Sequence, residues 1–317
     1  MEFHSAMQIS HENLNRTDYD LFILAAGYEL RSVYLAVDFS IKADVKLALA
    51  FEEKSKESQR RNNDVLLIGK GFDFMTFSGE QSVEMSPIFS QLSQGSEKEE
   101  LFILVDYSSM TKVWYSGILN FLIRDETLRK KLTVHFSYTP AIYNEPKKAG
   151  PVRFNKLISF PSGKPADSNK PTALIIGLGL DYSRSEFLLK NIKPELTTLL
   201  YADPSNDIKY VERVFQNNQE IIEQTGVRNL FSFPLDNLDR TNEILTDLCL
   251  SLRSRYNVIV APIGPKTLTL LALLLAARYP DISVVRISQG SGASIFERTP
   301  CCKPLVYSVE FLPEEGD

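Results

Sequence analysis

The chain has few of the residues on which most catalytic and metal sites depend. Only three histidines and three cysteines occur in 317 residues. Cys249, Cys301 and Cys302 lack the spacing of metal ligands, so we expect no metal site and reduced thiols, as in a cytoplasmic protein. His135 lies in a predicted strand, where a packed side chain is more common than a base. No Gly-x-Ser-x-Gly, P-loop or His-Glu-x-x-His motif is present, which argues against the familiar hydrolases.

Long apolar runs and an excess of basic charge are also missing. The longest apolar stretch, 268–277, is about ten residues, against the roughly 20 that span a bilayer. The first 20 residues are polar, unlike a signal peptide. The net charge is −5, divided as about −4 before residue 151 and −1 after it. We therefore expect a cytoplasmic protein that binds neither a membrane nor a long nucleic-acid duplex.

The alternation of strand-like and helix-like segments predicts an α/β fold. Unbroken apolar runs at 21–24 and 173–176 are typical of strands buried on both faces of a parallel sheet. We expect strands at 21–26, 45–51, 65–68, 101–105 and 132–137, then at 173–177, 197–202, 229–233, 257–261 and 283–288. We expect helices at 29–39, 55–62, 86–94 and 112–123, then at 183–191, 207–225, 239–255 and 266–278.

Similar segments recur at a near-constant offset, which predicts an internal duplication. The segment 31–35 (RSVYL) resembles 184–188 (RSEFL) at an offset of 153, and the run that leads to Lys112 resembles the run that leads to Lys266 at an offset of 154. The segments 157–161 and 309–313 match at an offset of 152. They overlap two strand-like tails, 152–160 and 304–312, each of which we expect to form an antiparallel edge strand or hairpin. We predict two tandem Rossmann-like units with mostly parallel sheets, at 1–162 and 172–317, joined by a polar linker at 163–171.

Ligands of open parallel sheets gather at the carboxyl ends of the strands, so the loops after the first and fourth strands are the candidate sites. The loops after the first strands supply glycines, hydroxyls and arginines suited to a phosphate group. The candidate residues there are Gly27, Arg31, Ser32, Gly177, Gly179, Arg184 and Ser185. Tyr182 stands where the dinucleotide fingerprint requires its third glycine, which argues against an NAD site.

The loops after the fourth strands each place a lysine at the start of a helix. A cation at that position opposes the helix macrodipole unless an anion binds nearby, although both lysines could also extend into solvent. The candidate residues are Ser108, Ser109, Thr111, Lys112, Gly264, Lys266 and Thr267.

These two turns resemble a known family. Ser108-Ser109-Met110-Thr111-Lys112 is similar to the Thr-Gly-Gly-Thr-Lys-like turn of CRISPR-associated Rossmann fold (CARF) domains, and 263–266 (IGPK) to a shortened version of it. The related SAVED domains are fusions of two such units. The resemblance implies binding of a cyclic oligonucleotide second messenger between two units and signalling to a separate effector protein. The double glycine of the family turn is missing from the first copy.

Three hypotheses of different classes follow from the sequence. The first is a sensor of a nucleotide second messenger in a prokaryotic antiviral defence system. The second is an enzyme that acts on a nucleotide, either a ring nuclease or a transferase that uses a nucleoside cofactor, with Ser108, Ser109 or Asp106 taking part. The third is a scaffold subunit whose Rossmann-like units bind only protein. We prefer the first hypothesis and expect no bound cofactor.

Overall fold

The computed structural model describes residues 1–53, 55–83, 85–95, 98–124, 130–144, 154–159, 167–205, 207–289 and 298–313. The chain divides into two compact units. Unit 1 comprises Met1–Ile142 with Phe296–Asp317, and unit 2 comprises Tyr143–Ile295. Each is a sheet flanked by helices, so the predicted α/β class with mostly parallel, Rossmann-like sheets is confirmed.

Unit 1 is built on a sheet of seven strands in the order β1-β13-β6-β5-β2-β3-β4. The five strands from β6 to β4 run parallel, whereas β13 is antiparallel to both β6 and β1. The strands are β1 (Glu2–Ile9), β2 (Asp18–Ala26), β3 (Lys42–Phe51), β4 (Asp73–Phe77), β5 (Glu100–Asp106), β6 (Lys131–Tyr138) and β13 (Leu305–Leu312).

The helices of unit 1 lie over an apolar core made largely by β2, in which every residue from Tyr19 to Ala26 is buried. Such continuous burial is expected of a central parallel strand covered on both faces. The helical segments are α1 (Asn13–Arg16), η1 (Leu30–Ser32), α2 (Tyr34–Asp38), α3 (Ser58–Gly69), α4 (Ser86–Gly95) and α5 (Lys112–Arg124).

Unit 2 is built on a six-stranded sheet in the order β10-β9-β8-β11-β12-β7. Only β7, at the edge beside β12, is antiparallel. The strands are β7 (Phe154–Ser159), β8 (Thr172–Gly177), β9 (Leu196–Ala202), β10 (Leu230–Phe233), β11 (Asn257–Pro262) and β12 (Ser283–Gln289). If the five parallel strands of each unit are numbered in chain order, both sheets read 3-2-1-4-5, the doubly wound arrangement.

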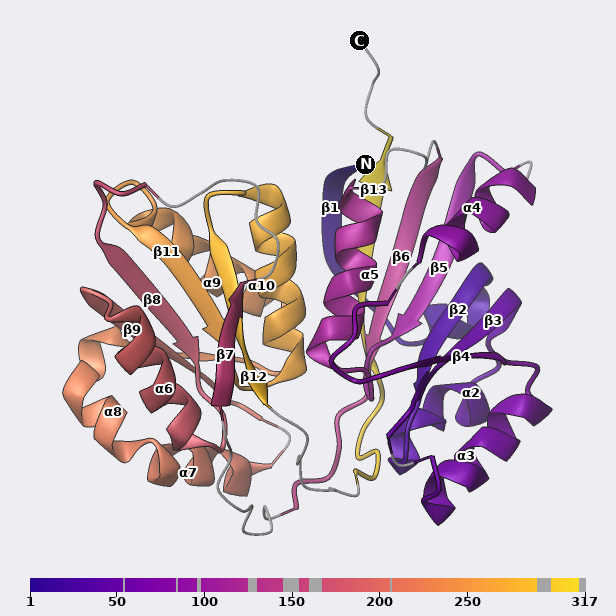
Figure 1. Ribbon diagram of the computed structural model, residues 1–317, viewed down its shortest axis with the longest axis horizontal. Coiled ribbons are helices and arrows are strands. Elements are labelled where there is room, and N and C mark those ends of the chain that lie inside the picture. Colours follow the sequence, from indigo (N-terminus) through magenta and orange to yellow (C-terminus); the bar gives the residue numbers. More distant parts are fainter. Residues whose placement is uncertain are drawn as a thin grey trace. The chain divides into compact units, whose positions relative to one another are not determined.

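The helices of unit 2 cover both faces of its sheet, with α6 to α8 on one face and α9 and α10 on the other (Figure 1). Helix α10 is apolar around its whole circumference, and all residues from Thr267 to Leu275 are buried. The helical segments are α6 (Tyr182–Ile192), α7 (Ile208–Asn217), α8 (Gln219–Thr225), η2 (Val227–Asn229), α9 (Leu238–Leu252) and α10 (Lys266–Arg278).

The two strand-like tails are antiparallel strands, as expected, but each belongs to the sheet of the other half of the chain. Strand β7 follows the parallel strands of unit 1 in sequence and pairs with β12 of unit 2. Strand β13 follows unit 2 and is inserted between β1 and β6 of unit 1, where Figure 1 draws it in yellow. We call this arrangement the strand exchange. The observed units therefore differ from the expected 1–162 and 172–317, and the part of the expected linker at 163–166 lies outside the described residues.

The helices expected at 29–39 and 207–225 are each divided into two segments, η1 with α2 and α7 with α8. Two further elements differ from the sequence-based prediction. The segment 65–68, expected to be the third strand, is the last part of α3, and the strand lies at β4. Val65, Leu66 and Ile68 are exposed on this helix, so only Leu67 of the apolar run that suggested a buried strand enters the core. The N-terminal segment, expected only to be polar, contains β1, which pairs with β13.

None of the helices in the described part of the chain combines the length and the apolar character that crossing a bilayer requires.

Candidate functional site

The candidate site of unit 1 lies where the loops after β2 and β5 meet, and Glu29 is the residue that joins them. Its carboxylate accepts hydrogen bonds from Arg31 Nε at 2.8 Å and from Ser109 Oγ at 3.0 Å. Arg298 Nε lies 3.6 Å from the other carboxylate oxygen. Three segments far apart in the sequence thus converge on one acid at the switch point between β2 and β5, where doubly wound sheets bind ligands.

Arg31, a predicted ligand residue, points into the protein. Its side chain is 2% exposed, and NH1 donates to the carbonyl oxygen of Thr139 at 3.3 Å. Its guanidinium also lies 5.7 Å from the centroid of the Tyr138 ring. Burial by itself would lower the pKa of Arg31, but the adjacent Glu29 carboxylate raises that pKa above its ordinary value. Arg31 is therefore a charged structural link between β2 and β6.

The turn after β2 is fixed by Ser32 and Asn63. Ser32 Oγ donates to the carbonyl oxygen of Glu29 at 2.8 Å. Asn63, from α3, donates to the carbonyl oxygen of Gly27 at 2.9 Å and to Ser32 Oγ at 3.0 Å. A Cβ atom on Gly27 would meet no atom closer than 3.8 Å, so packing does not require glycine there.

Ser108 and Ser109 differ in their surroundings although they are neighbours. Ser108 is fully buried, donates to the Asp106 carboxylate and accepts a hydrogen bond from the backbone N–H of Thr139 at 2.7 Å. These bonds join the ends of β5 and β6. Ser109, Thr111 and Lys112 are half-buried, and Lys112 is the first residue of α5. Of the predicted residues after β5, the last three are the ones with surface left to receive a ligand.

Trp114 packs in the interior of unit 1, behind the carboxyl ends of the strands, so its indole ring is not available to stack on a nucleotide base. It is fully buried and stacks on Phe51, with ring centroids 4.1 Å apart and planes 25° apart. Its Nε1 donates to the carbonyl oxygen of Ser78 at 3.1 Å. The loops after β3, β4 and β5 are thereby held together by one indole ring.

In unit 2 the glycines of the corresponding loops allow backbone to pack on backbone. The N–H of Gly264 donates to the carbonyl oxygen of Gly177 at 2.8 Å. A Cβ atom on Gly264 would lie 2.2 Å from the carbonyl oxygen of Leu178, and one on Gly179 would lie 3.0 Å from that of Ile263. The close approach that the sequence suggested for a ligand is used here by the neighbouring loop.

The polar residues after β8 also have partners within unit 2. Asp181 caps α6 by accepting from the backbone N–H of Ser183, and its carboxylate lies 3.3 Å from Arg184 Nε. Ser185 is buried, with Oγ 3.4 Å from Asn218 Oδ1. Asn218 in turn donates to the carbonyl oxygen of Gly179 at 2.8 Å.

Asn63 and Asn218 are equivalent contacts that the sequence analysis missed. Each holds the carbonyl oxygen of a glycine in the loop after the first parallel strand of its unit, and each lies within hydrogen-bond distance of a serine at the following helix. The only sign of these contacts in the sequence is the similar spacing, since the two asparagines follow those glycines by 36 and 39 residues.

Lys266 and Thr267 open the buried helix α10. Lys266 is half-buried at its first position, and Thr267 is buried with no hydrogen-bond partner for Oγ1 among the described residues. The same helical position is occupied by Lys112 in α5.

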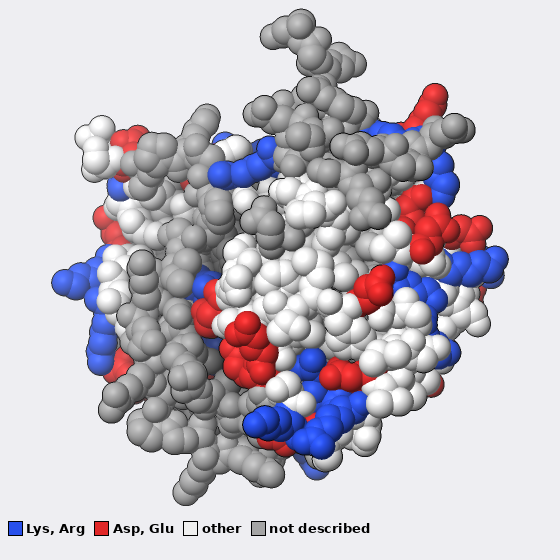
Figure 2. Space-filling model, turned by 45° about the vertical axis from the view of Figure 1, so that its right-hand side comes forward, with Lys and Arg blue, Asp and Glu red and all other residues white. Residues whose placement is uncertain are grey.

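Within the residues that the structure describes, no group of three or more His, Cys, Asp and Glu side chains could hold a metal ion. On the face shown in Figure 2, acidic and basic side chains of the described residues are interspersed rather than collected into one basic surface.

Comparison with known proteins gives no relative from which a function could be transferred. No family model matches the chain, and no curated protein is significantly similar to it.

Proposed function

We propose that this protein is a sensor of an anionic nucleotide second messenger, a cyclic oligonucleotide, which acts in a prokaryotic antiviral defence system and signals to a separate effector protein. The observation that carries the proposal is the matched position of two lysines. In two sheets with the same strand order, Lys112 and Lys266 each begin the helix that follows the fourth parallel strand. The resemblance of these turns to CARF domains supports the class of ligand.

Electrostatics supports an anion at these positions. Each lysine adds a positive charge at the end of a helix that already carries a partial positive charge, and each belongs to a helix of 13 residues. A phosphate would relieve this repulsion and would accept hydrogen bonds from the first N–H groups of the helix. In unit 1, the hydroxyls of Ser109 and Thr111 lie on the same turn and are half-buried.

The test is a binding screen of the full chain against mono-, di- and cyclic oligonucleotides. A ligand at a hundredfold excess over its Kd should stabilise the fold by about 2.7 kcal/mol, visible as a higher Tm. Loss of one charge-assisted contact is worth roughly 1.5–3 kcal/mol, so Lys112→Met and Lys266→Met should each weaken binding by about tenfold or more. Lys190→Met is the matched control, because Lys190 is exposed and paired with Glu186 on the surface of α6.

A scaffold subunit is the second candidate. The packing around Gly177, Gly179 and Gly264 favours it, because the space that a ligand would need beside these glycines is occupied by neighbouring protein atoms. Failure of every nucleotide to raise the Tm would put the scaffold function first. Chromatography of the nucleotides after incubation separates the sensor from the enzyme, because a ring nuclease or a transferase would form a new product.

A further inference from the structure

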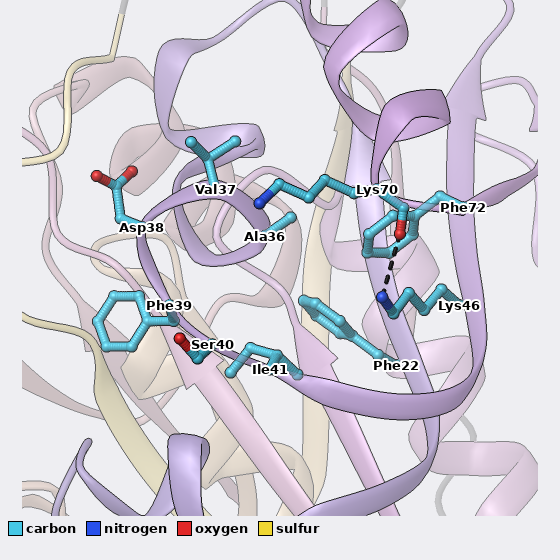
Figure 3. A pocket seen from close by; sticks show the side chains of 10 residues that line it. All are labelled: Phe22, Ala36, Val37, Asp38, Phe39, Ser40, Ile41, Lys46, Lys70 and Phe72. Atoms are coloured by element: carbon cyan, nitrogen blue, oxygen red, sulfur yellow. Dashed lines mark hydrogen bonds between the residues drawn. The ribbon is translucent and has the colours of Figure 1, made fainter.

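Unit 1 contains a pocket at the edge of its sheet opposite to the candidate site. Ile41 and Phe72 immediately precede β3 and β4, so the pocket lies at the amino ends of these parallel strands, whereas the candidate site lies at carboxyl ends. Its volume is about 270 Å³, slightly below the ~300–1,000 Å³ that small-molecule sites span. It is lined by Phe22, Ala36, Val37, Asp38, Phe39, Ser40, Ile41, Lys46, Lys70 and Phe72 (Figure 3).

The floor and one wall of this pocket are apolar and aromatic. Phe22 and Phe72 are buried and meet edge to face, with ring centroids 5.2 Å apart and planes 69° apart. Phe39 and Ile41 border the pocket from the segment between α2 and β3. Val37 is exposed and Phe39 and Ile41 are half-buried, so these three side chains supply the apolar surface against which a flat group can pack.

Two lysines supply the charge of the pocket. Lys46 extends from β3, and its Nζ donates to the backbone carbonyl oxygen of Lys70 at 3.1 Å, which holds the ammonium group at the pocket (Figure 3). Lys70 follows α3 and extends its own side chain across the pocket towards Ala36. Among the described residues, no carboxylate forms an ion pair with either ammonium group, and the Asp38 carboxylate points away from both lysines (Figure 3).

We infer that this pocket binds a small molecule with an apolar, preferably aromatic, body and one anionic group. The apolar body would pack against the accessible surface of Val37, Phe39 and Ile41, above the buried rings of Phe22 and Phe72, and the anion would accept hydrogen bonds from the ammonium groups of Lys46 and Lys70. Two cations that have no acidic partner among the described residues, beside an apolar wall, form a complementary surface for such a ligand, because the anion neutralises the charge while the apolar side chains exclude water. The inference does not depend on nucleotide binding, since it uses none of the same residues.

The experiment is calorimetric titration of the full chain with three probes of the same shape. These are 2-naphthoate, 2-naphthyl phosphate and 2-naphthylmethanol, which carry a carboxylate, a phosphate and a neutral hydroxyl. The two anions should bind, and the neutral alcohol should bind at least about tenfold more weakly. The stronger of the two anions identifies the acidic group that the pocket prefers.

Variants of the lysines locate the binding. Lys46→Met and Lys70→Met keep the length of the side chain and remove the charge, so each should weaken 2-naphthoate binding by about tenfold. Lys42→Met is the matched control, because Lys42 lies on the same strand, is exposed and pairs with Asp18. Circular dichroism confirms that each variant is folded.

Equal affinity of the alcohol and the acids, or equal affinity of the wild type and both lysine variants, would overturn the inference. Absence of binding by all three probes at millimolar concentration would also overturn it. None of these three results bears on the nucleotide sensor, which is tested through Lys112 and Lys266.

Discussion

At the scale of single residues, the loops of the candidate site in unit 1 turn several of their side chains into the protein. Gly27, Arg31, Ser32 and Ser108 all lie at the carboxyl ends of the strands of unit 1, as predicted, yet the structure buries them. The direction depends on partners far away in the chain, such as Thr139, which is 108 residues from Arg31. Pattern and spacing carry no information about such pairs, so the ligand contacts stay a prediction.

His135 gives a testable pH dependence. It is buried in β6 within hydrogen-bond distance (2.7 Å) of the Tyr19 hydroxyl, and burial lowers its pKa from 6.5 to about 4. The neutral imidazole is therefore favoured in the folded protein, and its pKa there lies below the unfolded value. The contribution of His135 to the free energy of unfolding is fully present above about pH 6.5 and is lost as the pH falls towards 4. The loss is on the order of 3 kcal/mol, and urea unfolding between about pH 7 and pH 4 measures it.

The comparison with two variants isolates this contribution. His135→Gln cannot titrate, so its free energy of unfolding should fall less than that of the wild type over the same pH range. His4→Gln is the control, because His4 is exposed on β1, and it should behave as the wild type does. The assignment to His135 fails if the pH profiles of the wild type and His135→Gln run parallel.

At the scale of elements, long segments with strong patterns were predictable and short apolar runs were not. The predicted helix at 266–278 matches α10, because thirteen residues without a breaker leave little choice. The run 65–68 (VLLI) fits a short buried strand as well as a helical turn, and local pattern cannot decide between them. In the folded protein the segment is part of α3, where three of its four residues are exposed.

The packing of loops in unit 2 predicts opposite effects for two glycine substitutions. Gly264→Ala would place Cβ against a backbone carbonyl oxygen that cannot move aside, so it should lower the free energy of unfolding by roughly 2 kcal/mol. Gly69→Ala, at the end of α3, meets no atom within 4 Å and should raise the free energy by about 0.5 kcal/mol through helix propensity. Urea denaturation measures both, and an equal response would contradict the close packing at Gly264.

At the scale of the whole molecule, the number of units was predictable and their boundaries were not. The alternating pattern gave two Rossmann-like sheets, and the tails were expected to be antiparallel strands. Such a pattern does not show which strand a tail will pair with, because the sequence pattern of an antiparallel strand is the same in either sheet. The duplication stays a prediction, supported by the common strand order and by the equivalent asparagine contacts.

The strand exchange predicts that damage to the last strand appears in unit 1. Val309 is fully buried on β13, opposite Val134 of β6 and Ala6 of β1. Val309→Pro removes a ladder hydrogen bond from an inner strand, so amide hydrogen exchange should accelerate in β1 and β6 and stay slow in β8 to β12. Val309→Ala keeps the backbone bonds and should give a smaller change. Acceleration confined to β12 would contradict the observed pairing.

The position of β13 also has a consequence for biosynthesis. When the segment from β1 through β6 has left the ribosome, β13 has not yet been translated, because it follows all of unit 2 in the sequence. In the folded sheet, β13 lies between β1 and β6. The nascent first half therefore presents an unpaired β6 edge for the time needed to make more than 160 residues. An open edge of this kind recruits other strands, so the arrival of β13 removes a site at which the emerging polypeptide could pair with another chain.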